Sequence, residues 1–336
     1  MPSKPSAKAR AWPLFDAIVD RAERKDVNPW AAGGTSFEPD FATLETLLAV
    51  PLYLSANTQS GVPALAFDVW AAYELRRAGL DPDAVWPRAV PPRVVARDVL
   101  RFVEGLPKKL QAEVSPRLLK GAAAKGVTAA SANIAGKNYL KQVDVIMSHW
   151  QTGPEILISG KRMDSSFGKN AANRVEESYG DAKNLALRHP LSALGFVFGL
   201  RSTCYTEEPK TFEWIVDLLI KLGREDGAYD ACSLIIPEYE GEAPAESDSE
   251  KGDAVMDPND VEQEDVDEED LSGIDAELAE LPRVQLRHDL VPDEISPARF
   301  FAVIIAKVLN NSSVTQHEEA RRRKSAQSAS QRPIRG

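Results

Sequence analysis

The chain has 336 residues, of which 43% are hydrophobic and 27% charged, and its formal net charge is −11. A chain of this length can bury the core of one large domain or two modest ones. Two cysteines are too few for a disulfide framework, and no apolar run reaches the roughly 18 residues of a membrane span. These features argue against a disulfide-rich secreted protein and against a membrane protein, and we expect a cytoplasmic one.

Residues 1–138 predict a helical N-terminal region. Apolar residues recur there at helical spacing in five segments, which are 12–24, 41–54, 63–78, 93–106 and, more weakly, 114–124. Residues 126–137 are rich in Ala, Ser, Gly and Asn and indicate a loop.

A second region, residues 139–237, has a different pattern. Two β-rich runs, 142–150 and 155–161, are separated by Gln151-Thr152-Gly153-Pro154, which predicts a hairpin. The elements that follow are predicted as a helix over 169–189, an apolar strand over 191–203, a helix over 210–224 and a strand over 229–236. We therefore expect an α/β protein whose core is a mixed β-sheet flanked by helices.

The rest of the chain divides by charge. Residues 238–280 contain 19 Asp or Glu and one Lys, a formal net charge of −18. The remaining residues therefore have a formal net charge of +7. Such a composition cannot bury a core, so we expect 238–282 to be a disordered acidic linker. Residues 283–310 predict a strand and a helix that pack on the core, and 311–336 a flexible basic tail.

Candidate site residues gather around the predicted hairpin. Ser159 and Lys161 share one face of the second strand, and Asp144 on the first strand can reach them if the register is favourable. On the following helix, Lys169, Asn173 and Glu176 share a face by their spacing. Two carboxylates and a lysine at a sheet edge can hold Mg²⁺, or Mn²⁺, and activate water. This combination predicts phosphodiester cleavage.

Asp144 and the Ser159-Gly160-Lys161 motif resemble the PD-(D/E)xK nuclease superfamily, which includes most type II restriction endonucleases. In that family an Asp on one strand and a (D/E)xK on the next hold catalytic metal. Val143 stands where proline is usual, and Ser159 replaces the expected acid. Restriction enzymes that cut CCGG-containing sites have this serine and take their second acid from an R-x-E on the following helix. Arg174-Val175-Glu176 follows Lys161 after twelve residues, as in that pattern.

A further likeness covers the loop and helix after the lysine. Ser166-Phe167-Gly168-Lys169-Asn170 and Asn173-Arg174-Val175-Glu176-Glu177 look like segments of restriction enzymes that cut CTCGAG. The whole resemblance covers roughly residues 139–205. It implies a restriction-endonuclease-like fold and Mg²⁺-dependent endonucleolytic cleavage of double-stranded DNA.

The resemblance also implies roles for individual residues. Asp144 and Glu176 would be metal ligands, Lys161 the cation that positions water, and Ser159 a secondary polar contact. DNA would be contacted by five residues of the loop and helix, namely Arg162, Lys169, Asn170, Asn173 and Arg174. A homodimer would cut both strands of a palindromic site, and a cognate DNA methyltransferase would belong to the same restriction-modification system.

Other interpretations stay open. Asp144 and Lys161 could form an ordinary ion pair, and Glu176 and Glu177 a solvated helix face. Glu74, on an N-terminal helix, is a candidate for one more acid at the site. Because Ser159 replaces an acid, the chain could be a catalytically inactive DNA-binding protein. It could also be an interaction protein that acts through its acidic segment, which could instead be a spacer or cover a basic cleft.

Overall fold

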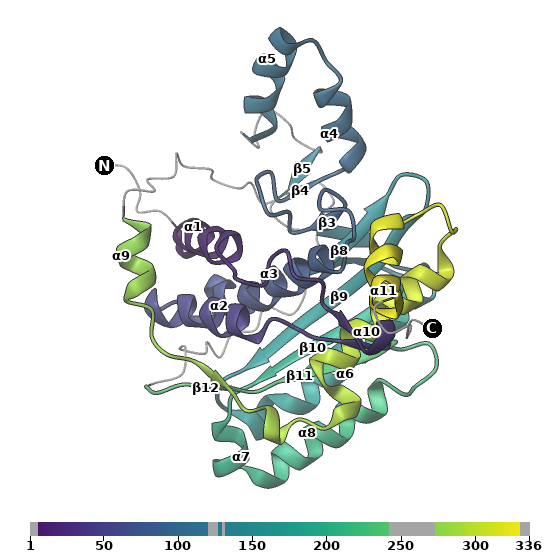
Figure 1. The fold of residues 1–336 in the computed structure, drawn as a ribbon. Helices are drawn as coiled ribbons and strands as arrows, with labels where there is room; N and C mark the ends of the chain where they lie inside the picture. Colours follow the sequence, from purple (N-terminus) through teal and green to yellow (C-terminus); the bar gives the residue numbers. More distant parts are fainter. Residues whose placement is uncertain (1–5, 120–126, 130–131, 242–272, 330–336) are drawn as a thin grey trace, which may run out of the picture.

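The structure, a computed structural model, describes residues 6–119, 127–129, 132–241 and 273–329. A five-stranded mixed sheet lies at its centre, with the strand order β11-β10-β9-β8-β3 (Figure 1). The strands are β3 (Val85–Trp86), β8 (Val145–His149), β9 (Gly153–Met163), β10 (Ala193–Leu200) and β11 (Ala231–Ile235). β9, β10 and β11 are parallel, whereas β8 is antiparallel to both β9 and β3. The predicted α/β class and mixed sheet are confirmed.

Helices cover both faces of this sheet. One face packs against α1 (Ala7–Asp20), α2 (Phe41–Tyr53), α3 (Val62–Arg77) and α10 (Pro297–Asn311), and the other against α6 (Phe167–Ala186) and α8 (Pro209–Leu222). All eight residues of β10 are buried, which explains why this strand reads as a continuous apolar run. Its side chains alternate between the two cores: Val197 faces the first, Phe196 and Phe198 the second.

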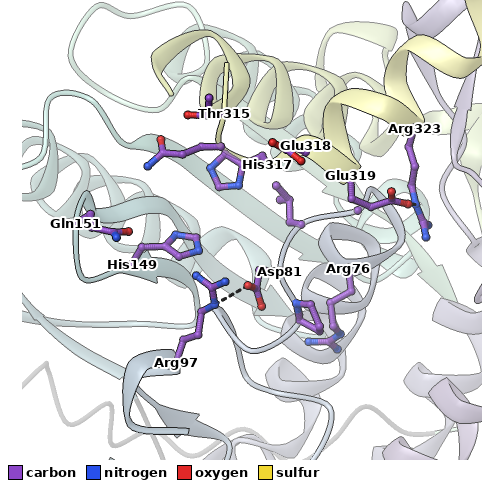
Figure 2. A pocket seen from close by; sticks show the side chains of 14 residues that line it. Arg76, Asp81, Arg97, His149, Gln151, Thr315, His317, Glu318, Glu319 and Arg323 are labelled. Atoms are coloured by element: carbon purple, nitrogen blue, oxygen red, sulfur yellow. Dashed lines mark hydrogen bonds and ion pairs between the residues drawn. The ribbon is translucent and has the colours of Figure 1, made fainter. Parts of the chain in front are cut away.

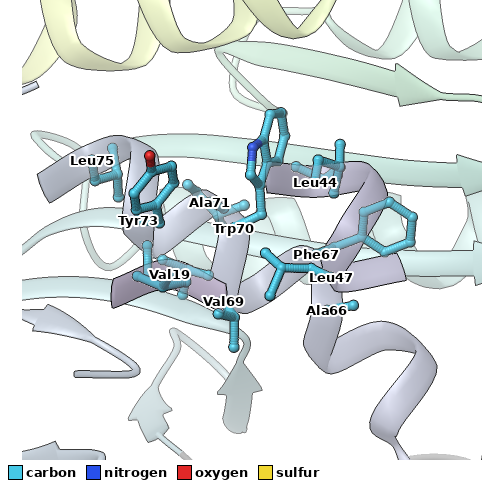
Figure 3. Packing of buried hydrophobic residues seen from close by; sticks show 14 of the residues in the cluster. Val19, Leu44, Leu47, Ala66, Phe67, Val69, Trp70, Ala71, Tyr73 and Leu75 are labelled. Atoms are coloured by element: carbon cyan, nitrogen blue, oxygen red, sulfur yellow. The ribbon is translucent and has the colours of Figure 1, made fainter. Parts of the chain in front are cut away.

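Two glycines of β10 let aromatic rings lie directly on the sheet. A methyl group placed on Gly195 would come within 2.6 Å of Phe300 on α10, and one on Gly199 within 2.6 Å of Phe67 on α3. A strand glycine often marks such a close approach. Phe67, Trp70 and Leu44 continue this packing between α2 and α3 (Figure 3). Gly199 therefore sets how closely α3 approaches the sheet.

The remaining elements are short or peripheral. Helices α4 (Arg97–Glu104) and α5 (Lys108–Leu119) project from the body (Figure 1). The other strands are β1 (Trp30–Ala31), β2 (Ser36–Phe37), β4 (Val94–Val95), β5 (Thr128–Ala129), β6 (Ala132–Ala135), β7 (Leu140–Val143), β12 (Pro237–Glu238) and β13 (Gln285–Leu286). The other helices are α7 (Thr203–Glu207), α9 (Ile274–Ala279) and α11 (Glu318–Ala329). No helix in the described ranges is long and apolar enough to cross a membrane.

The C-terminal segment differs from its prediction. Residues 311–336 were expected to be a flexible basic tail, but α11 packs against the body and its Ala320 is fully buried. Arg323 donates to the Arg77 carbonyl at 2.6 Å, and the Lys324 ammonium lies 4.3 Å from the centre of the Trp30 ring. These basic side chains hold the helix in place. The central part of the acidic linker, residues 242–272, lies outside the described residues, whereas α9 near its end is a helix.

Candidate active site

Asp144 lies at the bend between β7 and β8. Its neighbours Val143 and Val145 are each 1% exposed and belong to different cores, which fixes the backbone on both sides of it. Val145 pairs with Ile158 in the antiparallel hairpin, so Asp144 lies beside Ser159 and Gly160 of β9. Its Oδ2 accepts a hydrogen bond of 2.6 Å from the Gly160 amide. The register of the hairpin is the favourable one, because it brings Asp144 to the Ser159-Gly160-Lys161 motif.

A second carboxylate comes to the same place from α3. A methyl group placed on Gly160 would lie 3.3 Å from Asp68 Oδ1 and 3.8 Å from Asp144 Oδ2. The absence of a side chain at Gly160 therefore leaves space in which both acids converge. Asp68 is an acid between two buried apolar residues, Phe67 and Val69, and this interruption is the only signal the sequence offers for it.

The two carboxylates repel each other. Burial, and then the negative charge of Asp144, raise the pKa of Asp68 well above its ordinary value of 3.8, and Lys8 on α1 opposes this shift. Two acids held close in a poorly solvated place favour either a proton or a cation between them. Such a pair of carboxylates could hold a cation.

Lys161 follows Gly160 and meets a different acid from the expected one. Its ammonium lies 3.6 Å from Glu177 Oε2 on α6, and its side chain is 22% exposed. Glu176, Lys169 and Asn173 do share one helix face, as the spacing predicts, but all three are exposed to solvent. Glu177, the next residue along the helix, points towards β9 instead. The acid supplied to Lys161 by α6 is thus Glu177, and the second acid beside Asp144 is Asp68.

Ser159 lies inside the protein. It is 6% exposed, and its hydroxyl is close enough to Tyr229 to lower the pKa of that phenol, although burial dominates and raises it well above its usual value. Neither hydroxyl has a partner with full hydrogen-bond geometry within the described part of the chain. Ser159 therefore faces the Tyr229 side of the sheet and supplies no acid to the site.

Arg162, expected to contact DNA, has its guanidinium inside the protein. It bonds both oxygens of Asp164, at 2.7 and 2.8 Å, and Nη1 donates to the Pro63 carbonyl at 3.2 Å. The hydrogen bond to Pro63 ties β9 near its end to the start of α3, so Arg162 helps to position the helix that carries Asp68. Of the other predicted contacts, Lys169 and Asn173 are exposed and Arg174 is partly buried, while the side chain of Asn170 lies outside the described part.

Glu74 is a structural residue on α3. It is fully buried, its Oε2 lies 2.5 Å from Arg77 Nη1, and its Oε1 accepts from the Asp40 amide at 2.6 Å. Burial raises its pKa to about 7, although Arg77 opposes the shift. The N-terminal helix does contribute an acid to the site, but that acid is Asp68.

A separate polar cluster lies at the opposite end of β9. Glu155 Oε2 is 3.1 Å from His149 Nδ1 and 3.0 Å from His317 Nε2, and all three side chains are at most 11% exposed. Although burial opposes it, the histidines lower the pKa of Glu155 to about 2. The histidines line a cavity of about 570 Å³ under the start of α11 (Figure 2). His317 is far from Glu155 in sequence, so no local pattern could predict this cluster.

Comparisons with known proteins give no relative. No protein-family model, no curated protein and no solved structure matches the chain. Within the described ranges, no group of three or more His, Cys, Asp and Glu side chains is arranged to hold a metal ion. Any cation at Gly160 would thus rely on the two carboxylates of Asp68 and Asp144, with water or substrate oxygens completing its coordination.

Proposed function

We propose that this chain is a Mg²⁺-dependent endonuclease that cleaves double-stranded DNA. The observation that carries the proposal is the convergence of Asp68 and Asp144 at Gly160, one residue before Lys161. Mg²⁺ is commonly held by one or two carboxylates, with its other positions taken by water and substrate phosphates. A donor set of two carboxylates suits Mg²⁺ or Mn²⁺ and lacks the nitrogen and sulfur ligands that select zinc.

The topology supports a restriction-endonuclease-like core. Asp144 immediately precedes β8, and Ser159-Gly160-Lys161 lies in the second half of the antiparallel neighbour β9. This is the placement that the resemblance to PD-(D/E)xK nucleases implies, with an Asp on one strand and the lysine motif on the next. The departure lies in the second acid, which we assign to Asp68 on α3 in place of Glu176.

The roles follow from the chemistry of phosphodiester hydrolysis. Asp68 and Asp144 would hold Mg²⁺, which would supply a bound water of lowered pKa and stabilise charge on the phosphate. The Lys161 ammonium orients the attacking water or neutralises the developing negative charge. Glu177, 3.6 Å away, restrains that ammonium.

DNA binding is assigned to the exposed start of α6. Lys169 and Asn173 lie on its solvent face, and Arg174 is partly exposed beside them. Such side chains contact phosphates and base edges. A homodimer would place one such site on each DNA strand. Light scattering of the purified protein tests whether it is a dimer. A cognate DNA methyltransferase is the further partner that this proposal implies.

Plasmid cleavage with Mg²⁺, compared with the same reaction in EDTA, tests the proposal. Lys161→Ala should reduce cleavage by about 100-fold or more while DNA binding survives. Lys221→Ala removes the same charge from an exposed position on α8 and serves as the matched control. A fully active Lys161→Ala enzyme would remove the assignment.

One alternative has a specific observation behind it. Ser159 stands where the family has an acid, and it is buried beside Tyr229. A chain that binds DNA but never nicks it, with any divalent metal, would be a catalytically inactive DNA-binding protein on this fold. The other alternative, an interaction protein acting through its acidic segment, concerns residues that lie mostly outside the described part.

A further inference from the structure

A second cavity, of about 440 Å³, lies between α1, α3 and the segment 87–91, away from the proposed active site. Its volume falls within the range of small-molecule sites. Much of its wall is apolar and includes Trp12, Pro13, Val69, Pro87, Val90 and Ile274. An apolar wall with a few polar groups is typical of a site for an organic ligand.

Among the described residues, one cation of this cavity has no acidic side chain paired with it. Nearly all of its charged side chains form ion pairs, namely Asp16 with Arg93, Asp20 with Lys25, Arg21 with Asp275 and Arg88 with Asp83. Arg76 has no such pair among the described residues. Its one hydrogen bond there runs from Nη1 to the Pro87 carbonyl, at 2.9 Å. Four of the five N–H donors of this guanidinium thus remain for a ligand.

The surroundings make Arg76 a poorly compensated charge. Burial, and then the nearby guanidinium groups of Arg93 and Arg88, lower its pKa to about 10, with Asp16 opposing the shift. Arg93 is itself fixed, because it bonds Asp16 and lies 3.9 Å over the Trp12 ring. Arg76 also lines the larger cavity (Figure 2), but its guanidinium bonds the carbonyl of Pro87, which lines the smaller one.

We propose that this cavity binds a small organic anion, whose carboxylate or phosphate pairs with the Arg76 guanidinium and whose apolar ring contacts the wall at Trp12, Val69 and Val90. Guanidinium binds both oxyanions through paired hydrogen bonds, which explains why an arginine serves here. The ring replaces water against the apolar wall. This site is independent of the proposed DNA cleavage.

Isothermal titration with four probes tests the site. Phenyl phosphate and benzoate carry both the ring and the charge, benzyl alcohol carries the ring alone, and inorganic phosphate the charge alone. We expect at least one ring-bearing anion to bind with a Kd of about 1 mM or tighter, about tenfold tighter than either half-probe. A preference between the two anions identifies phosphate or carboxylate as the natural group. No binding of either ring-bearing anion would overturn the proposal.

Two variants separate the site from nonspecific binding. Arg76→Gln keeps a donor for the Pro87 carbonyl but removes the charge, and should weaken binding of the anion by about tenfold or more. Lys221→Gln, at an exposed and already paired position on α8 that does not line this cavity, should leave binding unchanged. Ala17→Phe fills the cavity from α1 and keeps Arg76, and should abolish binding even if Arg76→Gln does not fold. Equal binding by wild type and Ala17→Phe would contradict the site.

Discussion

The role that we propose for Asp68 requires a charged group that destabilises the fold. Its pKa lies above the ordinary 3.8, so its ionisation destabilises the folded state increasingly as pH rises above about 4. Asp68→Asn should therefore stabilise the metal-free protein at pH 7 by about 1–2 kcal/mol, and this gain should vanish below pH 4. Thermal unfolding with and without Mg²⁺ measures it.

We expect Mg²⁺ to stabilise the wild type, and the same variant should lose that stabilisation because one of the two carboxylates is gone. Asp275→Asn, which removes an acid with an 85% exposed side chain, is the matched control. It should change neither the stability of the metal-free protein nor the stabilisation by Mg²⁺ appreciably. A metal-induced shift that survives in Asp68→Asn would remove Asp68 from the metal site.

Glu155 predicts a pH effect of the opposite sign. Its pKa is about 2 in the folded protein and near 4.5 in the unfolded chain. The contact with His149 and His317 therefore stabilises the folded state above pH 4.5, and this stabilisation is lost as the pH falls towards 2. The shift corresponds to at most about 3 kcal/mol. Denaturant unfolding should show that Glu155→Gln is less stable than wild type at pH 5, and that the difference shrinks towards pH 2. A difference independent of pH would contradict this.

At the scale of elements, the packing of α3 on β10 controls where Asp68 lies. A methyl group at Gly199 meets Phe67, the residue before Asp68, so Gly199→Ala should shift α3 and cost about 1–3 kcal/mol. DNA cleavage should fall as well. Gly195→Ala creates the same 2.6 Å conflict with Phe300 on α10, and should cost similar stability while sparing cleavage.

Thermal unfolding and single-turnover cleavage of both glycine variants measure this pair of effects. Similar losses of stability with different losses of cleavage would support α3 as the element that positions the site. Equal losses of cleavage would show that global destabilisation alone explains both.

Local patterns predicted most elements but not the contacts between distant ones. The hairpin of β8 and β9, the helix α6 and the strand β10 were all predicted, because each has its own periodicity and turn residues. Strand β3 has two residues and no readable period, so it was missed. Asp68 reaches Gly160 only through the packing of α3, and α11 docks only through tertiary contacts. The spacing predicted Glu176 as the acid near Lys161. The orientation of α6, which the sequence does not fix, places Glu177 beside the lysine.

At the scale of the whole molecule, charge is strongly segregated along the chain. Residues 242–272 contain 14 acidic residues and one lysine, so deleting them changes the formal net charge from −11 to +2. If this segment limits unproductive DNA binding, the deletion should tighten nonspecific DNA binding and steepen its dependence on salt. Fluorescence anisotropy over a salt series measures both. Unchanged binding at every salt concentration would make the segment a spacer.

In the proposed site, Asp68 and Asp144, and not Glu176, form the acidic pair beside Lys161. Rates of Mg²⁺-dependent plasmid cleavage by Asp68→Asn, Asp144→Asn and Glu176→Gln, side by side with wild type, test it most directly. We predict losses of about 100-fold or more for the first two variants and near wild-type cleavage for the third. An inactive Glu176→Gln enzyme together with an active Asp68→Asn enzyme would contradict the assignment of Asp68 to the acidic pair.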